Sequence, residues 1–126
     1  MDDDLYREEL LDHYYSSPHR GHLEAPDFGF ELENALCGDR IKIEMQLDAR
    51  QTISRVRFNG DGCVISQAAA SLLAERMEGA TLQEALRFSA DEMLELIKAR
   101  LTPARRKCGL LAWRALQRAL PKDAEV

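Results

Sequence analysis

Several features that would point to a familiar class of protein are absent from this sequence. Its 126 residues contain no apolar run long enough to cross a bilayer, which predicts no membrane span. Acidic residues outnumber basic ones by 22 to 17, and the net charge of −5 argues against general nucleic-acid binding. The first residues, Met1-Asp2-Asp3-Asp4, lack the basic and apolar regions of a signal peptide and predict a cytoplasmic protein. No Ser-His-Asp order, P-loop or dinucleotide fingerprint occurs.

Cysteine is also scarce, but each of the three cysteines has an informative setting. They occur in Cys37-Gly38-Asp39, Asp61-Gly62-Cys63 and Arg105-Arg106-Lys107-Cys108. Because no C-x-x-C pair exists and the separations are 26 and 45 residues, only tertiary folding can bring the thiols together. An odd number of cysteines in a reducing compartment does not suit a disulfide framework.

Three thiolates and the Asp39 carboxylate provide four ligands, the number that a tetrahedral zinc or the edge of a small iron-sulfur cluster requires. The alternative is that the cysteines are small buried hydrophobic residues. Adjacent glycines suit loops rather than core strands for Cys37 and Cys63, and three cations precede Cys108. These settings favour a metal or sulfur site.

The hydrophobic pattern changes once along the chain, from strands to helices. A helix is predicted over residues 3–16 and ends at Ser16-Ser17-Pro18, and residues 19–27 form a loop. Apolar residues then alternate with polar ones in three antiparallel strands with one buried face. Their alternating positions fall within residues 28–32, 41–47 and 53–58, with a hairpin connection at residues 48–51.

After Cys63 the sequence predicts helices to its end. One runs from Ser66 to Glu78, and Gly79 is its C-cap. Two capping boxes start the next two helices, and the later of these helices extends toward Arg100. Pro103 opens a last helix, whose apolar residues and Trp113 belong to the core. The capping boxes are Thr81 with Glu84 and Ser89 with Glu92. We expect one domain, 1–126, of the α+β class, with helices packed on one face of a three-stranded antiparallel sheet.

This order places the candidate ligands at one end of the sheet. Cys37 and Asp39 lie between the first two strands, Cys63 precedes a helix, and Cys108 lies in the opening turns of the last helix. A helix N-terminus favours the thiolate at Cys63. The cations before Cys108 either do the same or form a solvated helix face.

These residues carry a resemblance to U-type iron-sulfur scaffold proteins. Three segments around the cysteines and an N-terminal motif with Asp12-His13-Tyr14 and Pro18 resemble that family from about Leu5 to Leu120. The segments are Leu36-Cys37-Gly38-Asp39-Arg40-Ile41, Asn59-Gly60-Asp61-Gly62-Cys63-Val64-Ile65-Ser66 and Pro103-Ala104-Arg105-Arg106-Lys107-Cys108. The sequence is most similar to the SufU type through its Gly-Asp-Gly-Cys, Ser-Gln-Ala-Ala-Ala-Ser and Pro-Ala-Arg-Arg-Lys-Cys stretches.

Two features depart from the SufU and IscU types. The 45-residue spacing before Cys108 lacks the usual SufU insertion, and Lys107 stands where the IscU type usually has histidine. Leu101-Thr102-Pro103-Ala104-Arg105 differs from the segment by which IscU-like proteins contact an Hsp70 chaperone, so the resemblance does not carry that partner over.

The resemblance implies that Cys37, Asp39, Cys63 and Cys108 are the metal or cluster ligands, with Asp39 the exchangeable one. It implies a cysteine desulfurase as sulfur donor, Cys37 in preference to Cys108 as persulfide acceptor, and apo iron-sulfur proteins as recipients. His13, His19 and His22 are left out of the site because structural or solvated roles are favoured for them.

Three functions remain open at this point. The first is a scaffold that assembles and transfers a [2Fe-2S] cluster, holding iron transiently. The second is a zinc-dependent sulfurtransferase that carries persulfide without building a cluster. The third is a zinc-stabilised interaction module. A scaffold or sulfur carrier is favoured over a free-standing enzyme, and a sulfurtransferase is the enzymatic alternative.

Overall fold

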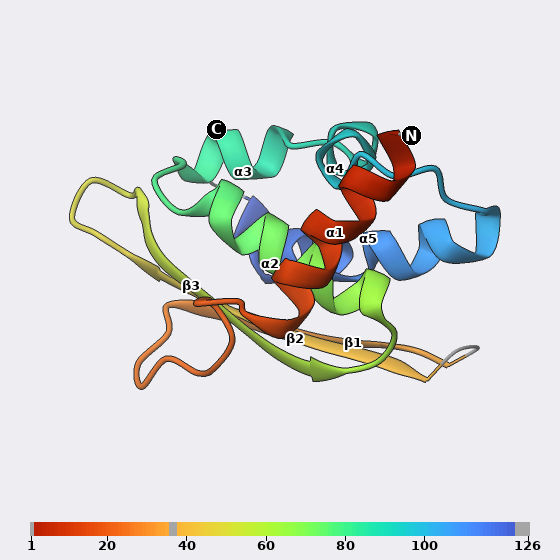
Figure 1. The fold of residues 1–126 in the computed structure, drawn as a ribbon. Coiled ribbons are helices and arrows are strands. Elements are labelled where there is room, and N and C mark those ends of the chain that lie inside the picture. The colour runs from red at the N-terminus through yellow and green to blue at the C-terminus, as the bar shows by residue number, and fades with distance from the viewer. Residues whose placement is uncertain (1, 36–37, 123–126) are drawn as a thin grey trace.

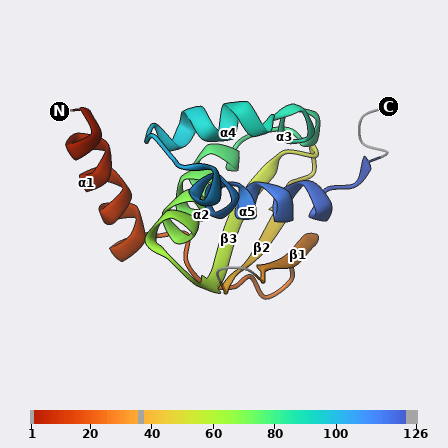
Figure 2. The same ribbon diagram turned by 90° about the vertical axis from the view of Figure 1, so that its right-hand side faces the viewer.

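The computed structural model describes residues 2–35 and 38–122 and confirms the α+β class. A three-stranded antiparallel sheet lies under helices α2 and α5, with α3 and α4 above them and α1 beside α2 (Figures 1 and 2). The elements are α1 (Asp2–Tyr15), β1 (Phe28–Asn34), β2 (Asp39–Leu47), β3 (Ile53–Asp61), α2 (Val64–Met77), α3 (Leu82–Arg87), α4 (Ala90–Ile97) and α5 (Pro103–Ala119).

The central strand β2 organises the core because it pairs with both β1 and β3. Its alternate residues Ile41, Ile43 and Met45 are fully buried on the face that the helices cover. Helix α5 packs over β1 and β2, and α2 packs over β3 and against α5. The period-two pattern therefore predicted the buried face of β2 correctly. In β1 it was less accurate, because Phe30 is 37% exposed.

Most helix ends follow the sequence signals. Helix α2 starts at Val64, two residues before the predicted Ser66, because Cys63 is its N-cap. Both predicted capping boxes form, at Thr81 with Glu84 and at Ser89 with Glu92. Gly79 takes a φ of +92° after α2, as a C-cap glycine does. Helix α4, however, ends at Ile97 and not near Arg100, because Lys98 adopts the left-handed conformation with φ of 62° and closes the helix.

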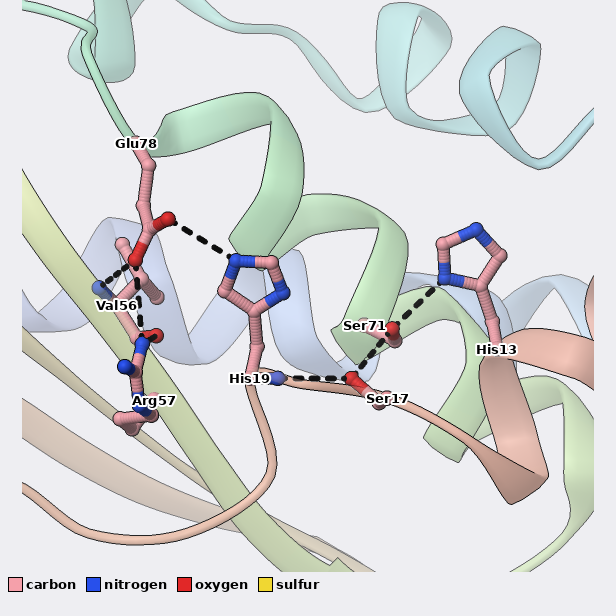
Figure 3. Close-up of polar contacts among 7 residues, drawn as sticks. All are labelled: His13, Ser17, His19, Val56, Arg57, Ser71 and Glu78. Carbon is pink, nitrogen blue, oxygen red and sulfur yellow. Dashed lines mark hydrogen bonds and ion pairs between the residues drawn. The ribbon is translucent and has the colours of Figure 1, made fainter.

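The N-terminal helix α1 buries only part of its apolar surface. Leu10 is buried, but Tyr15 is 76% exposed and rests edge-on against Tyr14. Helix α1 packs against α2. A polar contact fastens it there, since His13 Nδ1 lies 2.8 Å from Ser71 Oγ (Figure 3).

A chain of polar contacts then holds the loop after α1 against α2 and β3 (Figure 3). Ser71 Oγ donates to Ser17 Oγ over 2.7 Å, and Ser17 Oγ accepts the His19 N–H over 3.2 Å. His19 Nε2 lies 3.0 Å from Glu78 Oε1. Residues 19–21 continue along the edge of β3, where the His19 carbonyl accepts the Phe58 N–H and the Gly21 N–H donates to the Phe58 carbonyl.

The other face of the sheet is partly covered by the same loop. Leu23 is buried, and its N–H donates to Glu44 Oε1 over 3.2 Å. This contact explains why Glu44, on the face of β2 away from the helices, is 7% exposed. Among the helices that the structure describes, none is both long and apolar enough to cross a membrane.

Glu78 predicts how stability depends on pH. Burial alone would raise its pKa, but the Val56 N–H, His19 and Arg57 outweigh burial and hold the pKa of Glu78 below its ordinary value of 4.5. The stabilisation is therefore present above about pH 4.5 and is lost as the pH falls through the lower folded-state pKa. We expect Glu78→Gln to lower the free energy of unfolding by about 1–3 kcal/mol near neutral pH, and by progressively less in acid.

Urea denaturation across this pH range measures the effect. Glu75→Gln is the control, because Glu75 is exposed in α2, the helix that Glu78 follows. This variant should have the same pH dependence of stability as the wild type. Parallel pH profiles for the wild type and Glu78→Gln would refute this role of Glu78.

Candidate metal centre

Three of the four predicted ligands come together in the structure. Within the described residues, Asp39, Cys63 and Cys108 form a group whose ligand atoms all lie within 4.8 Å of one another. Asp39 is the first residue of β2 and not, as predicted, part of the connection before it, because it pairs with Asn34 of β1. Cys63 is the N-cap of α2, and Cys108 lies in the second turn of α5. Cys37 lies outside the described residues, so its place in the site stays a prediction.

Asp39 and Cys63 are joined by a backbone hydrogen bond. The Cys63 N–H donates to Asp39 Oδ1 over 2.8 Å, and Cys63 Sγ lies 3.7 Å from Asp39 Oδ2. The Asp39 side chain is buried, and the N–H that it accepts lies at the N-terminus of α2, where helices favour negative charge. One carboxylate oxygen is thereby fixed by the backbone, and the other is directed to the sulfur.

Gly62 allows this close approach. Its φ of +149° is disfavoured for residues with a side chain, and a Cβ on Gly62 would overlap the Asp39 carboxylate and come within 2.9 Å of Ser66 Oγ. The glycine before Cys63 is therefore required both by backbone conformation and by space.

The pairing of β2 with β3 brings the start of β2 close to the end of β3. Arg40 pairs with Asp61 across β2 and β3, which places Asp39 beside the start of α2. The Arg40 guanidinium bonds Asp61 Oδ2 over 2.9 Å and Glu31 Oε1 over 3.3 Å, so one side chain fastens all three strands at this end. The hydrogen bond to Asp61, with the nearby Glu31, raises the pKa of Arg40 and keeps the guanidinium charged.

Cys108 reaches the site from α5. Thr102 caps this helix by accepting the Arg105 N–H, and Pro103 occupies its first turn. Cys108 is buried, and a hollow of about 360 Å³ separates α5 from the corner at Gly62; it is lined by Asp39, Gly62, Cys63, Ala104, Arg105 and Cys108. Arg105 thus faces the site, and the side chains of Arg106 and Lys107 are exposed, as a solvated helix face predicts.

The donor set suits a thiophilic metal. In a tetrahedral site with metal–sulfur bonds of ~2.3 Å, neighbouring ligand atoms are roughly 3.8 Å apart. The Asp39–Cys63 separation of 3.7 Å meets this spacing, and the 4.8 Å limit for the whole group needs only a small closure on binding. The residues present therefore fit zinc or iron, and Cys37 would supply the fourth ligand.

The histidines have other partners. His13 contacts Ser71, His19 contacts Glu78, and His22 lies 3.1 Å from Asn59 and 3.5 Å from Glu44. These contacts agree with the structural roles expected for them.

Sequence reasoning missed two polar residues beside the centre. Ser66 and Gln67 are almost fully buried in the first turn of α2. Two adjacent polar residues, three and four positions after Cys63 in a helix otherwise rich in alanine and leucine, were the available signal.

Comparisons with known proteins identify the family of the chain. The family model of the NifU-like N terminal domain matches residues 5–124. The chain is 33% identical to "Zinc-dependent sulfurtransferase SufU" of Bacillus subtilis, covering 96% of this chain and 92% of that protein. It is 34% identical to "Iron-sulfur cluster assembly scaffold protein IscU" of Thermotoga maritima, covering 94% of each.

A solved structure has the same fold. The chain superimposes with a TM-score of 0.81 on a putative iron-sulfur cluster assembly scaffold protein for the SUF system from Fervidobacterium islandicum. The identity is 27%, and the match covers 96% of this chain and all of the other.

Gly62 gives a test of the metal centre with a close control. Gly62→Ala should weaken zinc binding by more than about 10-fold, because the new methyl group displaces Asp39 from the Cys63 N–H. Gly79→Ala also introduces a side chain at positive φ, but its Cβ meets nothing within 4 Å. It should lower stability and leave the zinc affinity unchanged.

Competition titration with a chromogenic chelator measures both affinities. Equal zinc affinities in the two folded variants would contradict the proposed role of the Gly62 corner.

Proposed function

This chain belongs to the family of the NifU-like N-terminal domain, and from that premise we propose that it is an iron-sulfur cluster assembly scaffold. It accepts sulfur from a cysteine desulfurase, assembles a [2Fe-2S] cluster and transfers it to apo iron-sulfur proteins. The observation that carries this proposal is the convergence of Asp39, Cys63 and Cys108 from three separate elements around one hollow. Cys37 completes the proposed ligand set.

The mixed donor set explains how a cluster is held and then released. Thiolates are soft ligands suited to iron-sulfur clusters, whereas carboxylate oxygen is a harder ligand. Asp39 is therefore the ligand expected to exchange most readily. Its bond to the Cys63 N–H keeps the carboxylate next to the site while its coordination changes.

Sulfur is transferred from the desulfurase by exchange between a thiolate and a persulfide. The Cys37 thiolate attacks the outer sulfur of the desulfurase persulfide, the sulfur–sulfur bond breaks, and the desulfurase thiolate leaves. The transferred sulfur is then a persulfide on Cys37, and two electrons from an external donor release it as sulfide. Arg105 lines the hollow and provides positive charge for an anionic sulfur that enters it.

A second candidate function is a zinc-dependent sulfurtransferase. Two observations favour it: the similarity to the Bacillus subtilis protein of that name, and Lys107 at the position before Cys108. In this case the same four residues hold zinc, and Cys37 carries persulfide to a recipient without building a cluster.

The sulfur acceptor can be identified directly. Incubation with a cysteine desulfurase and cysteine should place a persulfide on Cys37, because that residue matches the acceptor of SufU-like proteins. Alkylation of the persulfide followed by peptide mass spectrometry measures its position, and Cys37→Ser should remove most of the label. Label on Cys108 alone would overturn the acceptor assignment, and an unlabelled protein would favour the interaction module.

A substitution at Asp39 distinguishes the scaffold function from the sulfur-carrier function. Under the scaffold proposal, anaerobic reconstitution with iron, sulfide and thiol gives the wild type a [2Fe-2S] spectrum that moves to an apo-ferredoxin. Asp39→Ala should hold its cluster longer, because loss of the carboxylate slows ligand exchange. Glu75→Ala, which removes an exposed carboxylate outside the ligand group, should transfer at the wild-type rate.

Transfer is followed by the absorption or circular dichroism of the ferredoxin. A reconstituted wild type that stays colourless, retains zinc and accelerates the desulfurase would refute the scaffold function and support the sulfur-carrier function.

A further inference from the structure

Two adjacent buried polar side chains lie in the first turn of α2, just after Cys63. Ser66 is 0% exposed and Gln67 is 2% exposed, between Ile65 and Ala68. Burying a hydroxyl and an amide is unfavourable unless both are hydrogen-bonded. Their partners therefore indicate why these residues occupy the first turn of α2.

The partners form a chain that ends at the Cys63 sulfur. Arg20 Nη1 donates to Gln67 Oε1 over 3.3 Å, and Gln67 Nε2 donates to Ser66 Oγ over 3.3 Å. Ser66 Oγ lies 3.1 Å from the Cys63 carbonyl oxygen and 3.9 Å from Cys63 Sγ. A cationic guanidinium is thus connected through an amide and a hydroxyl to a candidate ligand.

The far end of the chain is held in place at the surface. Arg20 Nη2 donates to the Tyr14 carbonyl over 2.9 Å, and the guanidinium carbon lies 4.9 Å from the centre of the Phe58 ring. Arg20 and Gln67 also line a surface pocket that reaches Gly62. These contacts hold the Arg20 guanidinium in place, and Arg20 in turn fixes the orientation of the Gln67 amide.

The hydroxyl has few choices of orientation. Because Gln67 Nε2 donates to Ser66 Oγ, the Ser66 hydrogen is left for one of its two other neighbours, the Cys63 carbonyl or the Cys63 sulfur. In the structure the hydroxyl donates to the carbonyl, and the Cys63 thiol donates to the hydroxyl oxygen. A metal-bound Cys63 has lost its proton. The contact with sulfur then persists only if the hydroxyl turns and donates to it.

We propose that Ser66 is a positioning residue that donates a hydrogen bond to the metal-bound sulfur of Cys63, with Gln67 and Arg20 fixing the direction of its hydroxyl. A hydrogen bond to a thiolate withdraws electron density from the sulfur and orients it toward the metal. The inference rests on the metal binding that the proposed function requires, and it holds for a scaffold and for a zinc carrier alike.

Cobalt substitution gives a readout that does not depend on activity. Co(II) bound by thiolates has a sulfur-to-metal charge-transfer band, and loss of a hydrogen bond to sulfur raises the energy of the sulfur electrons. Ser66→Ala should therefore move this band to longer wavelength and weaken Co(II) binding by ~10-fold.

Ser71→Ala is the matched control. Ser71 is equally buried in the same helix, but its hydroxyl contacts His13 and Ser17 instead of the site. This variant should lose stability with an unchanged charge-transfer band. Gln67→Met removes the amide that orients the Ser66 hydroxyl and should give a smaller shift in the same direction, and it carries the test if Ser66→Ala does not fold.

The outcomes separate this inference from the proposed function. A wild type without a cobalt-thiolate band would overturn both. A normal wild-type band that stays unmoved in the folded Ser66→Ala protein, or in Gln67→Met as its substitute, would overturn the role of Ser66 and leave the proposed function standing.

Discussion

The hydrogen bond from the Cys63 N–H to Asp39 Oδ1 is the contact on which the candidate site depends. It joins the start of β2 to the N-terminus of α2, and it exists because Gly62 leaves the space that a side chain would fill. The antiparallel register of β2 and β3 delivers both ends to the same place. Helix α5 then adds Cys108 across the hollow.

The arrangement has a consequence for ligand exchange. Asp39 is buried and oriented by a backbone N–H that persists whichever atom the carboxylate coordinates. A carboxylate that leaves the metal is therefore kept beside the site and is ready to return. This property suits a protein that must hold a metal or cluster and give it up, and it serves a scaffold and a sulfur carrier equally.

Much of the fold could be predicted because local signals and the global structure agree. The alternation from Ile41 to Leu47 predicted the buried face of β2, and the two capping boxes predicted the starts of α3 and α4. The end of α4 could not be predicted, because Lys98 in the left-handed conformation has no sequence signal comparable to glycine. The exposure of Tyr15 depends on how α1 docks against α2, which is a tertiary property.

The candidate site, like the fold, could be predicted only in part from the sequence. Residue type, the glycines beside Asp39 and Cys63, and the cations before Cys108 pointed to these three residues before their distances were known. The Arg20–Gln67–Ser66 chain was not predicted, because it joins a loop to a helix 47 residues away and each member alone is an ordinary polar residue.

The central claim is that this ligand group holds an iron-sulfur cluster. Mössbauer spectroscopy of the anaerobically reconstituted protein, combined with iron and sulfide analysis, tests it most directly. The account predicts about two irons and two sulfides per chain, as a coupled pair whose irons differ because one of them is bound by the Asp39 oxygen. Iron that washes away while zinc remains bound would contradict it.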